Sequence, residues 1–185
     1  MELVFDIETD GLLWPTEFKN KEGDNISLPS ASQIWCIVAI DETDTVHTFD
    51  PSQIDEGIEF LKSADVLVGH NIIGFDIPAI KRIKNVDLHS HATIIDTLTL
   101  SRLLHPTREG GHSLEKWGWK LNCPKSDQPV FTEYSKEMMD YCIQDVRLNK
   151  KVLDKLRKDS VGFSKDSVEL EHVTTKILIE QELNG

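Results

Sequence analysis

The sequence predicts an α/β protein, and three observations lead to this prediction. The chain opens with a strand-like apolar run at residues 2–8. Runs typical of strands and of helices then alternate between residues 34 and 84, which is the order found in a mixed α/β sheet. Helical patterns fill most of the chain beyond residue 96. With 185 residues and 39% hydrophobic content, the chain is long and apolar enough to form one globular unit.

Each element follows from a local pattern. Apolar runs bounded by polar turn residues predict three more strands, at 34–40, 45–49 and 66–69. The polar stretch 14–32, rich in Asn, Ser and Pro, predicts a long loop. A helix is expected to begin near Ser52 and to bury Ile54, Ile58 and Leu61. Further helices are expected at 77–84, 96–104, 113–120, about 135–158 and about 165–183, with Asp96 and Ser113 as N-caps.

Composition excludes several classes of protein. The net charge of −12 argues against a protein that coats long stretches of nucleic acid, because that needs many phosphate-neutralising Lys and Arg residues. It permits an enzyme that grips a few nucleotides through bound metals. Cys36, Cys123 and Cys142 lack a Cys-x-x-Cys spacing, which favours neither a disulfide framework nor a zinc cluster. No apolar run reaches the roughly 18 residues of a membrane span, so we expect no membrane contact and a place in the cytoplasm.

Two carboxylates stand one residue apart in the first strand. Alternation along a strand points Asp6 and Glu8 to the same face. Two like charges about 4 Å apart repel by roughly 4 kcal/mol at an effective dielectric of about 20, unless a cation lies between them. Oxygen ligands alone suit Mg²⁺ or Mn²⁺ better than zinc. The alternative is an edge strand whose alternate residues simply face water.

Two later segments carry acids in informative places. A turn with glycines follows the strand 66–69 and leads to Asp76 at the start of a helix, and ligand groups commonly lie at such strand ends. In the long helix, Tyr141 and Asp145 are four residues apart and therefore share a face. If the four acids Asp6, Glu8, Asp76 and Asp145 converge, their charge of −4 would be balanced by two divalent cations.

The order and spacing of these residues resemble the three motifs of the DEDD nucleases. The matching pieces are Asp6-x-Glu8-Thr9, Asn71-x4-Asp76 and Tyr141-x3-Asp145, and the tyrosine is typical of the tyrosine subclass. More narrowly, the chain is similar to the proofreading domain of family A DNA polymerases of short-tailed phages. The similar pieces include His70-Asn71, 75–79, 95–98, 101–103, 112–118 and 138–146, so the resemblance covers nearly all of the chain.

The resemblance implies an RNase H-like fold, with a five-stranded mixed central sheet flanked by helices and the acids at one edge. It divides the chain into a DEDD exonuclease domain at 1–160 and a C-terminal helix at 161–185 that is similar to the junction to a polymerase domain. Loop 14–32 is longer than expected for these relatives.

The resemblance also implies two-metal hydrolysis of a phosphodiester at the 3′ end of DNA, with Mg²⁺ or Mn²⁺. By this resemblance Asp6, Glu8 and Asp145 hold the ion that activates water, and Asp6 holds the ion that stabilises the leaving oxygen. Asp76 acts mainly through metal-bound water. Tyr141 orients the attacking water, because a phenol with a pKa near 10 is a poor base at neutral pH.

Four residues are expected to touch the terminal nucleotides: Thr9, Leu12, Asn71 and Phe75. Leu12 is expected to wedge between bases. Because the long loop 14–32 follows Leu12 directly, the register of this wedge is open.

Two alternatives to DNA proofreading stay open. One is an RNA-trimming exonuclease of the ribonuclease D type, and the other is a catalytically inactive DEDD fold that serves as a docking module. The last helix has an apolar surface broader than one stripe, which fits either docking onto a polymerase domain or separate polymerase chain, or packing on the same domain. Its apolar residues are Val168, Leu170, Val173, Ile177, Leu178 and Leu183.

Three further residues receive structural interpretations. Trp117 and Trp119 are expected in the core, and Cys142 is expected to be a small core residue rather than a nucleophile.

Overall fold

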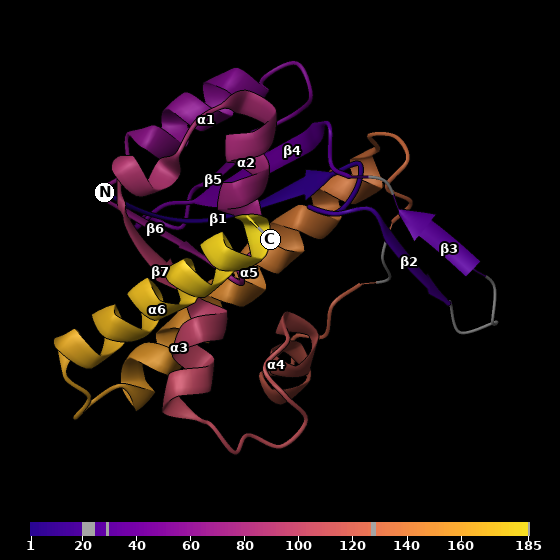
Figure 1. The fold of residues 1–185 in the computed structure, drawn as a ribbon. Helices are drawn as coiled ribbons and strands as arrows, with labels where there is room; N and C mark the ends of the chain where they lie inside the picture. The colour runs from indigo at the N-terminus through magenta and orange to yellow at the C-terminus, as the bar shows by residue number, and fades with distance from the viewer. Residues whose placement is uncertain (20–24, 29, 127–128, 185) are drawn as a thin grey trace.

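A mixed sheet of five strands forms the centre of the protein, in the order β5-β4-β1-β6-β7 (Figure 1). The computed structural model describes residues 1–19, 25–28, 30–126 and 129–184. β4 is antiparallel to both of its neighbours, while β1, β6 and β7 run parallel to one another. This confirms the predicted five-stranded mixed sheet. The strands are β1 (Glu2–Thr9), β4 (Ile34–Ile40), β5 (Val46–Phe49), β6 (Val66–Gly69) and β7 (Thr93–Asp96).

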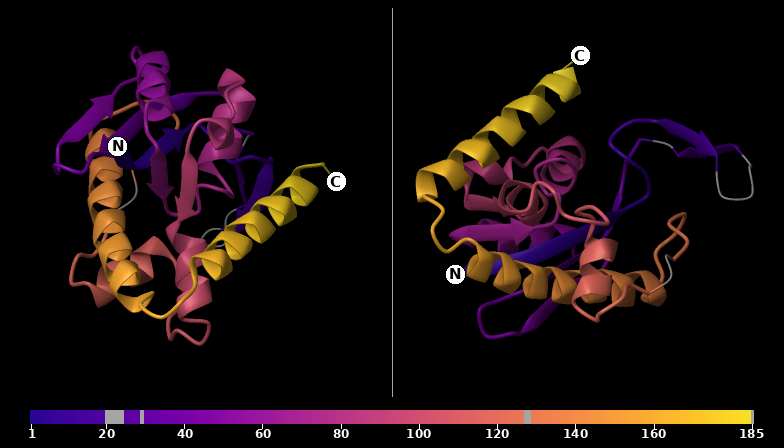
Figure 2. Two further views of the ribbon diagram at one scale, coloured as in Figure 1. Left: turned by 90° about the vertical axis from the view of Figure 1, so that its left-hand side faces the viewer. Right: turned by 90° about the horizontal axis from the view of Figure 1, so that it is seen from below.

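Helices cover both faces of this sheet (Figures 1 and 2). α1 and α2 pack on one face, and the long helix α5 crosses the other face against β4 and β1. α3 and α4 pack against α5, and α6 lies against α3 and β7. The helices are α1 (Ile54–Lys62), α2 (Asp76–Lys84), α3 (Thr97–Leu104), α4 (Leu114–Lys120), α5 (Lys136–Asp159) and α6 (Lys165–Asn184), with a 3₁₀ turn at Leu88–Ser90.

Strand β1 divides its side chains between the two faces. Leu3, Phe5 and Ile7 are buried in the same cluster as the apolar residues of α1 and α2. Val4 points the other way and is buried in a cluster with Val146 of α5. Burying each large apolar side chain contributes about 1.5–3 kcal/mol, so the register of β1 is strongly fixed. The even-numbered positions of β1 therefore face α5.

The prediction of a loop over residues 14–32 is wrong for part of this stretch. β2 (Thr16–Lys19) and β3 (Asn25–Leu28) pair antiparallel in a separate two-stranded sheet that projects from the central one (Figures 1 and 2). Residues of high β propensity recur at alternate positions in both segments, but each run is only four residues long and stands among turn formers. Residues 20–24 and 29 of the expected loop lie outside the described residues.

The fifth strand, β7, was not predicted from its own residues. It is four residues long and pairs with β6 from Val66–Thr93 to Gly69–Asp96. The helix that follows begins at Thr97, one residue later than expected, because Asp96 is its N-cap and accepts hydrogen bonds from the amides of Leu98 and Thr99. The predicted cap is confirmed.

The two tryptophans of α4 lie in different surroundings. Trp117 is fully buried and donates a hydrogen bond from Nε1 to Ser101 Oγ at 3.0 Å. Trp119 is 64% exposed, so its predicted place in the core is wrong. Two residues apart on a helix, the two side chains point in nearly opposite directions. Cys142 is fully buried, as predicted.

Helix α6 is only partly engaged with the rest of the chain. His172 is buried and accepts a hydrogen bond from the amide of Asp96, while Val168 and Leu183 pack against the core. Four apolar residues of the helix stay exposed: Leu170, Val173, Ile177 and Leu178. The packing interpretation is therefore confirmed for one part of the helix, and docking of its exposed part onto a polymerase stays a prediction.

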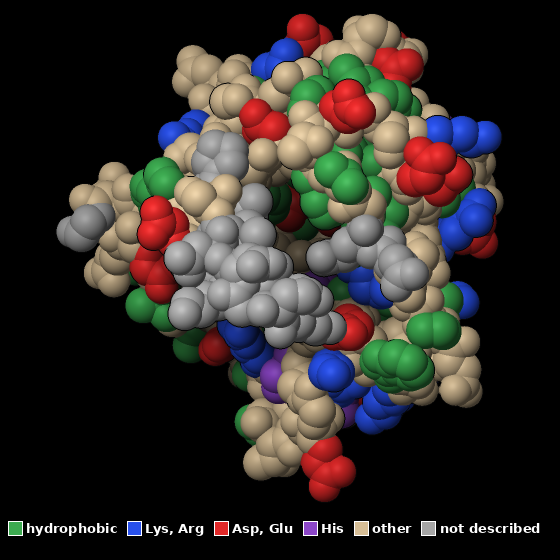
Figure 3. All heavy atoms as spheres, turned by 90° about the vertical axis from the view of Figure 1, so that its right-hand side faces the viewer, with side chains coloured by type: hydrophobic (Ala, Val, Ile, Leu, Met, Phe, Trp, Pro, Cys, Tyr) green, Lys and Arg blue, Asp and Glu red, His purple; other side chains and the backbone are tan. Residues whose placement is uncertain are grey.

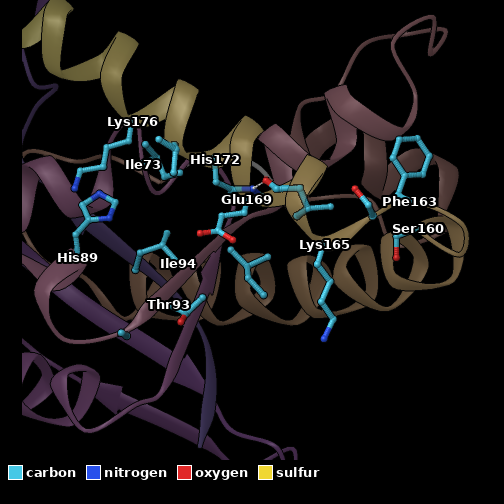
Figure 4. A pocket seen from close by; sticks show the side chains of 15 residues that line it. Ile73, His89, Thr93, Ile94, Ser160, Phe163, Lys165, Glu169, His172 and Lys176 are labelled. Carbon is cyan, nitrogen blue, oxygen red and sulfur yellow. Dashed lines mark hydrogen bonds between the residues drawn. The ribbon is translucent and has the colours of Figure 1, made fainter.

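A pocket of about 850 Å³ lies between α6 and β7 (Figure 4). Ile94, Phe163 and His172 are among its lining residues, and none of the predicted site acids lines it. Within the described ranges no helix combines the length and the apolar character that crossing a membrane requires.

Gly69 gives a test of the packing at the end of β6. A Cβ at this position would lie 1.9 Å from Ile72 Cγ2, and Ile72 is fully buried and cannot move aside without displacing its neighbours. We expect Gly69→Ala to lower the free energy of unfolding by about 1–3 kcal/mol in urea denaturation. The exposed substitution Glu56→Ala is the control and should change it by less than about 0.5 kcal/mol. Equal stability of both variants would contradict the close packing described here.

Candidate active site

Asp6 and Glu8 project from β1 toward α5, as the alternation of the strand predicts. A carboxylate oxygen of each lies within 4.8 Å of the other and of Cys142 Sγ. The Cys142 thiol donates to Asp6 Oδ2 at 3.6 Å, which ties the strand to the helix at this point. Glu8 pairs with Cys36 of β4 and is 9% exposed. The two acids therefore share one largely buried place between sheet and helix.

Helix α5 brings the third acid to the same place. Tyr141 and Asp145 are both buried, one turn apart, beside Cys142. Asp145 is close enough to raise the pKa values of both Asp6 and Glu8. The ring of Tyr141 meets Phe131 edge-on, with 6.4 Å between ring centroids. The face of α5 that carries Tyr141 and Asp145, predicted from their separation of four residues, thus points at the acids of β1.

Asp76 reaches the cluster from the first turn of α2. β6 pairs with β1 only as far as Val4, so the amide of Ile7 has no strand partner on that side. Asp76 Oδ1 accepts a hydrogen bond from this amide at 3.2 Å and lies close enough to Asp6 to raise its pKa. Because the pairing between β1 and β6 ends early, the amide of Ile7 is left to bind the carboxylate of Asp76, the fourth acid.

Asp96 fixes the turn that leads to Asp76. Its two carboxylate oxygens accept hydrogen bonds from the amides of Asn71 and Ile73, each at 3.0 Å, besides capping α3. Asn71 has a left-handed backbone, with φ at 66°. A buried carboxylate therefore holds the backbone of the turn, which in turn sets where α2 and Asp76 begin.

Burial and mutual repulsion raise the pKa values of the acids. The pKa of Asp6 lies well above the usual range. Burial is the largest cause, and the negative charges of Asp76, Glu8 and Asp145 add to it. Burial, with Cys36 and Asp145, raises the pKa of Glu8 to about 9. Burial raises the pKa of Asp76 to about 7 against the opposing hydrogen bond from Ile7. Four carboxylates gathered in this way favour a positive charge among them.

One cation is already supplied by the described part of the chain. Lys125, in the segment between α4 and α5, forms an ion pair with Asp145 Oδ2. Its ammonium lies 4.6 Å from the ring centroid of Tyr141. The sequence alone assigns no role to Lys125, because nothing in its local pattern separates it from the other basic residues of the chain.

The residues present fit a divalent cation. The cluster offers carboxylate oxygens from Asp6, Glu8, Asp76 and Asp145, the donors that Mg²⁺ and Mn²⁺ prefer. Asp145 Oδ1 is buried with no hydrogen-bond partner among the described residues, which leaves one oxygen ready for a ligand bond. Figure 3 views the side toward which β1 runs, where a hollow has acidic side chains at its bottom.

The four predicted nucleotide contacts lie near the ends of the same elements. The Thr9 hydroxyl donates to the carbonyl of Gly11 at 2.7 Å, so its side chain serves the turn after β1. Leu12 is 38% exposed, and Asn71 is exposed on its turn. Phe75 is half-buried against the core beside α2. Their contact with nucleotides stays a prediction.

The five-stranded mixed sheet is the RNase H-like arrangement predicted from the sequence, with the four acids gathered at one edge of it. Two DNA-directed DNA polymerases resemble the chain in sequence. The chain is 27% identical to that of Enterobacteria phage T3 over 226 aligned positions, with 89% of this chain and 32% of the polymerase covered. It is 26% identical to that of Escherichia phage T7 over 223 positions, with 87% and 32% covered. The chain therefore spans about a third of the length of these relatives. No protein-family model matches it.

Solved nuclease structures share the fold. The apo form of a nuclease superimposes with a TM-score of 0.71 at 14% identity, covering all of this chain and 85% of the other. Brucella melitensis NrnC bound to pGG gives 0.70 at 14% identity, covering 100% and 85%. NrnC with bound Mg²⁺ gives 0.69 at 13% identity, covering 100% and 86%. At this level of identity the likeness concerns the fold.

The raised pKa of Glu8 predicts how stability depends on pH without metal. A raised carboxyl pKa favours the protonated form in the folded state, so its contribution is present below the usual value of 4.5 and is lost as the pH rises toward 9. We expect the free energy of unfolding in EDTA to fall between pH 7 and 9, with Glu8 contributing up to about 1.4 kcal/mol per pH unit and Asp6, whose pKa is also raised, adding to the fall. This window lies above the titration of His70, whose pKa burial lowers to about 4.

Urea denaturation at pH 7, 8 and 9 measures this dependence. Glu8→Gln should make the fall shallower, because the amide has no proton to lose while Asp6 keeps a raised pKa. The exposed substitution Glu56→Gln should leave the fall unchanged. A free energy of unfolding that stays constant or rises with pH in the unchanged protein would contradict the electrostatics described here.

Proposed function

We propose that the chain is a metal-dependent 3′-to-5′ exodeoxyribonuclease that removes nucleotides from the 3′ end of DNA in support of a family A DNA polymerase. The observation that carries the proposal is the convergence of Asp6, Glu8, Asp76 and Asp145 from three separate segments, with Tyr141 beside them. The sequence similarity to two phage DNA polymerases supports the choice of DNA and of a polymerase partner.

Carboxylates in this arrangement serve metal-assisted hydrolysis. Asp6, Glu8 and Asp145 would hold one divalent ion and Asp6 a second, with Asp76 acting through water. Such ions lower the pKa of bound water and stabilise the leaving oxygen. The chain's own contribution is to fix the donor oxygens on rigid elements, a central strand and a long helix, so that little reorganisation remains at the moment of reaction.

Tyr141 is proposed to orient the attacking water. Its side chain is buried between Phe131 and Lys125, which limits its rotation, and it lies one turn from Asp145. A phenol with a pKa near 10 holds its proton at neutral pH and can donate or accept a hydrogen bond without removing a proton. This role is a positioning one.

The terminal nucleotides are proposed to lie across the ends of β1 and β6. Thr9 and Leu12 follow β1, and Asn71 and Phe75 lie on the turn after β6, so all four come from the edge at which the acids gather. Leu12 is exposed enough to enter between two bases. The exposed apolar face of α6 is proposed to meet a polymerase domain or chain.

A second candidate is an exonuclease acting on RNA. The observation in its favour is the similarity of fold to NrnC, which was solved bound to pGG. The two candidates share the acids and the metal and differ in the sugar of the substrate. A catalytically inactive docking module is the third candidate, and the presence of all four acids and Tyr141 argues against it.

Removing Asp145 tests the acidic site. We expect Asp145→Ala to reduce cleavage of a 5′-labelled single-stranded DNA in Mn²⁺ by at least about 10²–10³-fold, because a ligand of the divalent ion that would activate water is lost. Asp154→Ala removes an exposed carboxylate from the same helix and serves as the matched control. Circular dichroism checks that both variants fold. Equal rates in the folded Asp145→Ala protein would reject the site.

Matched oligonucleotides test the substrate. DNA and RNA of the same sequence, labelled at the 5′ end or blocked at the 3′ end, are incubated with the unchanged protein and Mg²⁺ or Mn²⁺. We expect stepwise shortening of the DNA from its free 3′ end and slower digestion of the RNA. Faster digestion of RNA would overturn the DNA assignment, and no digestion of either would favour the docking module.

A further inference from the structure

The segment between α4 and α5 is fastened to α5 on both sides of Lys125. Gln144 Nε2 donates to the carbonyl of Pro124 at 2.9 Å. Gln144 Oε1 accepts from the amide of Ser126 at 3.0 Å and from its hydroxyl at 2.5 Å. Gln144 directly precedes Asp145 in the helix. The backbone around Lys125 is therefore tied to the residue beside the acid that its side chain meets.

The side chain of Lys125 is aimed into the acidic cluster rather than into solvent. It is only 18% exposed and forms an ion pair with Asp145 Oδ2. Burial alone would lower the pKa of Lys125, but Asp145 and Tyr141 beside it raise the pKa overall, so the side chain is an ammonium. A buried lysine held in this manner costs desolvation of the ammonium, which the surrounding carboxylates offset.

The charge of Lys125 reaches beyond its direct partner. It also lowers the pKa values of Asp6 and Glu8 against the repulsion that raises them. It thus compensates acids from both β1 and α5. A divalent cation held by these acids would seek the same carboxylate oxygens, including the one on Asp145 that Lys125 contacts.

We propose that Lys125 is a built-in counterion that competes with a divalent metal ion for Asp145, so that metal binding must displace the ammonium from this carboxylate. The inference rests on the proposed function, since it concerns the metal of that site. It assigns a positioning role to a residue outside the acidic motifs. The hydrogen bonds of Gln144 to Pro124 and Ser126 keep the displaced ammonium of Lys125 close to the cluster, because they hold the backbone on both sides of Lys125 to α5.

Titration of Mn²⁺ into the full chain by calorimetry tests the competition. Lys125→Met keeps the length of the side chain and removes its charge. We expect it to bind Mn²⁺ about tenfold or more tightly than the unchanged protein, which corresponds to about 1.4 kcal/mol of lost competition. Lys81→Met is the matched control, because Lys81 also pairs with a carboxylate, that of Asp87, but lies outside the cluster. Its affinity for Mn²⁺ should not change.

Equal or weaker Mn²⁺ affinity in Lys125→Met would overturn the proposal. Lys125→Arg keeps the charge and should bind Mn²⁺ within a few-fold of the unchanged protein. If it instead binds as tightly as Lys125→Met, charge is not the cause and the proposal fails.

Reductive methylation of the unchanged protein gives an independent measurement that does not depend on folding of a variant. Mass spectrometry follows the rate at which each lysine is methylated, with and without saturating Mn²⁺. We expect methylation of Lys125 to become several-fold faster in Mn²⁺, because its ammonium leaves Asp145, while that of Lys81 stays constant. An unchanged or slower rate at Lys125 would overturn the proposal.

These readouts separate the two proposals. Unchanged protein that binds no Mn²⁺ and digests no oligonucleotide would reject the proposed function and this inference together. Protein that binds Mn²⁺ and digests DNA, but whose affinity is indifferent to Lys125→Met, would reject only the role of Lys125.

Discussion

Repulsion among buried carboxylates is the constraint on which the rest of this site depends. Asp6, Glu8, Asp76 and Asp145 are all held where water cannot fully solvate their charges, and their pKa values rise accordingly. Nothing local in β1 or α5 favours such a gathering. The apolar packing of the two sheet faces and the pairing of five strands must supply the free energy that keeps the acids together.

The fold meets this constraint by placing each acid with a different device. The alternation of β1 sends Leu3 and Phe5 to one face and the acids to the other. The early end of the pairing between β1 and β6 leaves the amide of Ile7 for Asp76. Burial of Val146 on α5 fixes the helix against the core and so places Asp145, the residue before it, at the cluster. Each device is anchored by burial outside the site, so a change within the site need not disturb the fold.

The parts of this arrangement that are local in sequence could be predicted. The alternation of side chains along β1 and the shared face of residues four apart in a helix are fixed by backbone geometry. Both rules correctly predicted the directions of Asp6 and Glu8 on β1 and of Tyr141 and Asp145 on α5. What could not be predicted depends on distant partners. β7 is defined by its pairing with β6, and Lys125 gains its role only through Asp145 and Gln144 on another element. No local period marks either of them. β2 and β3 do carry alternating β-forming residues, but each run is only four residues long and stands among turn formers, so the pair was not predicted.

The charges also suggest an order of events for the proposed function. The chain carries a net charge of −12, and its site holds four acids against one lysine, so a phosphate approaching the bare cluster is repelled. Two divalent ions would bring +4 to a site whose residues sum to −3 with all acids ionised, and the result of +1 matches the single negative charge of one phosphodiester. In the proposed function, cation binding would therefore precede productive binding of the nucleic acid, and the charge of Lys125 would make the metal-loaded site positive.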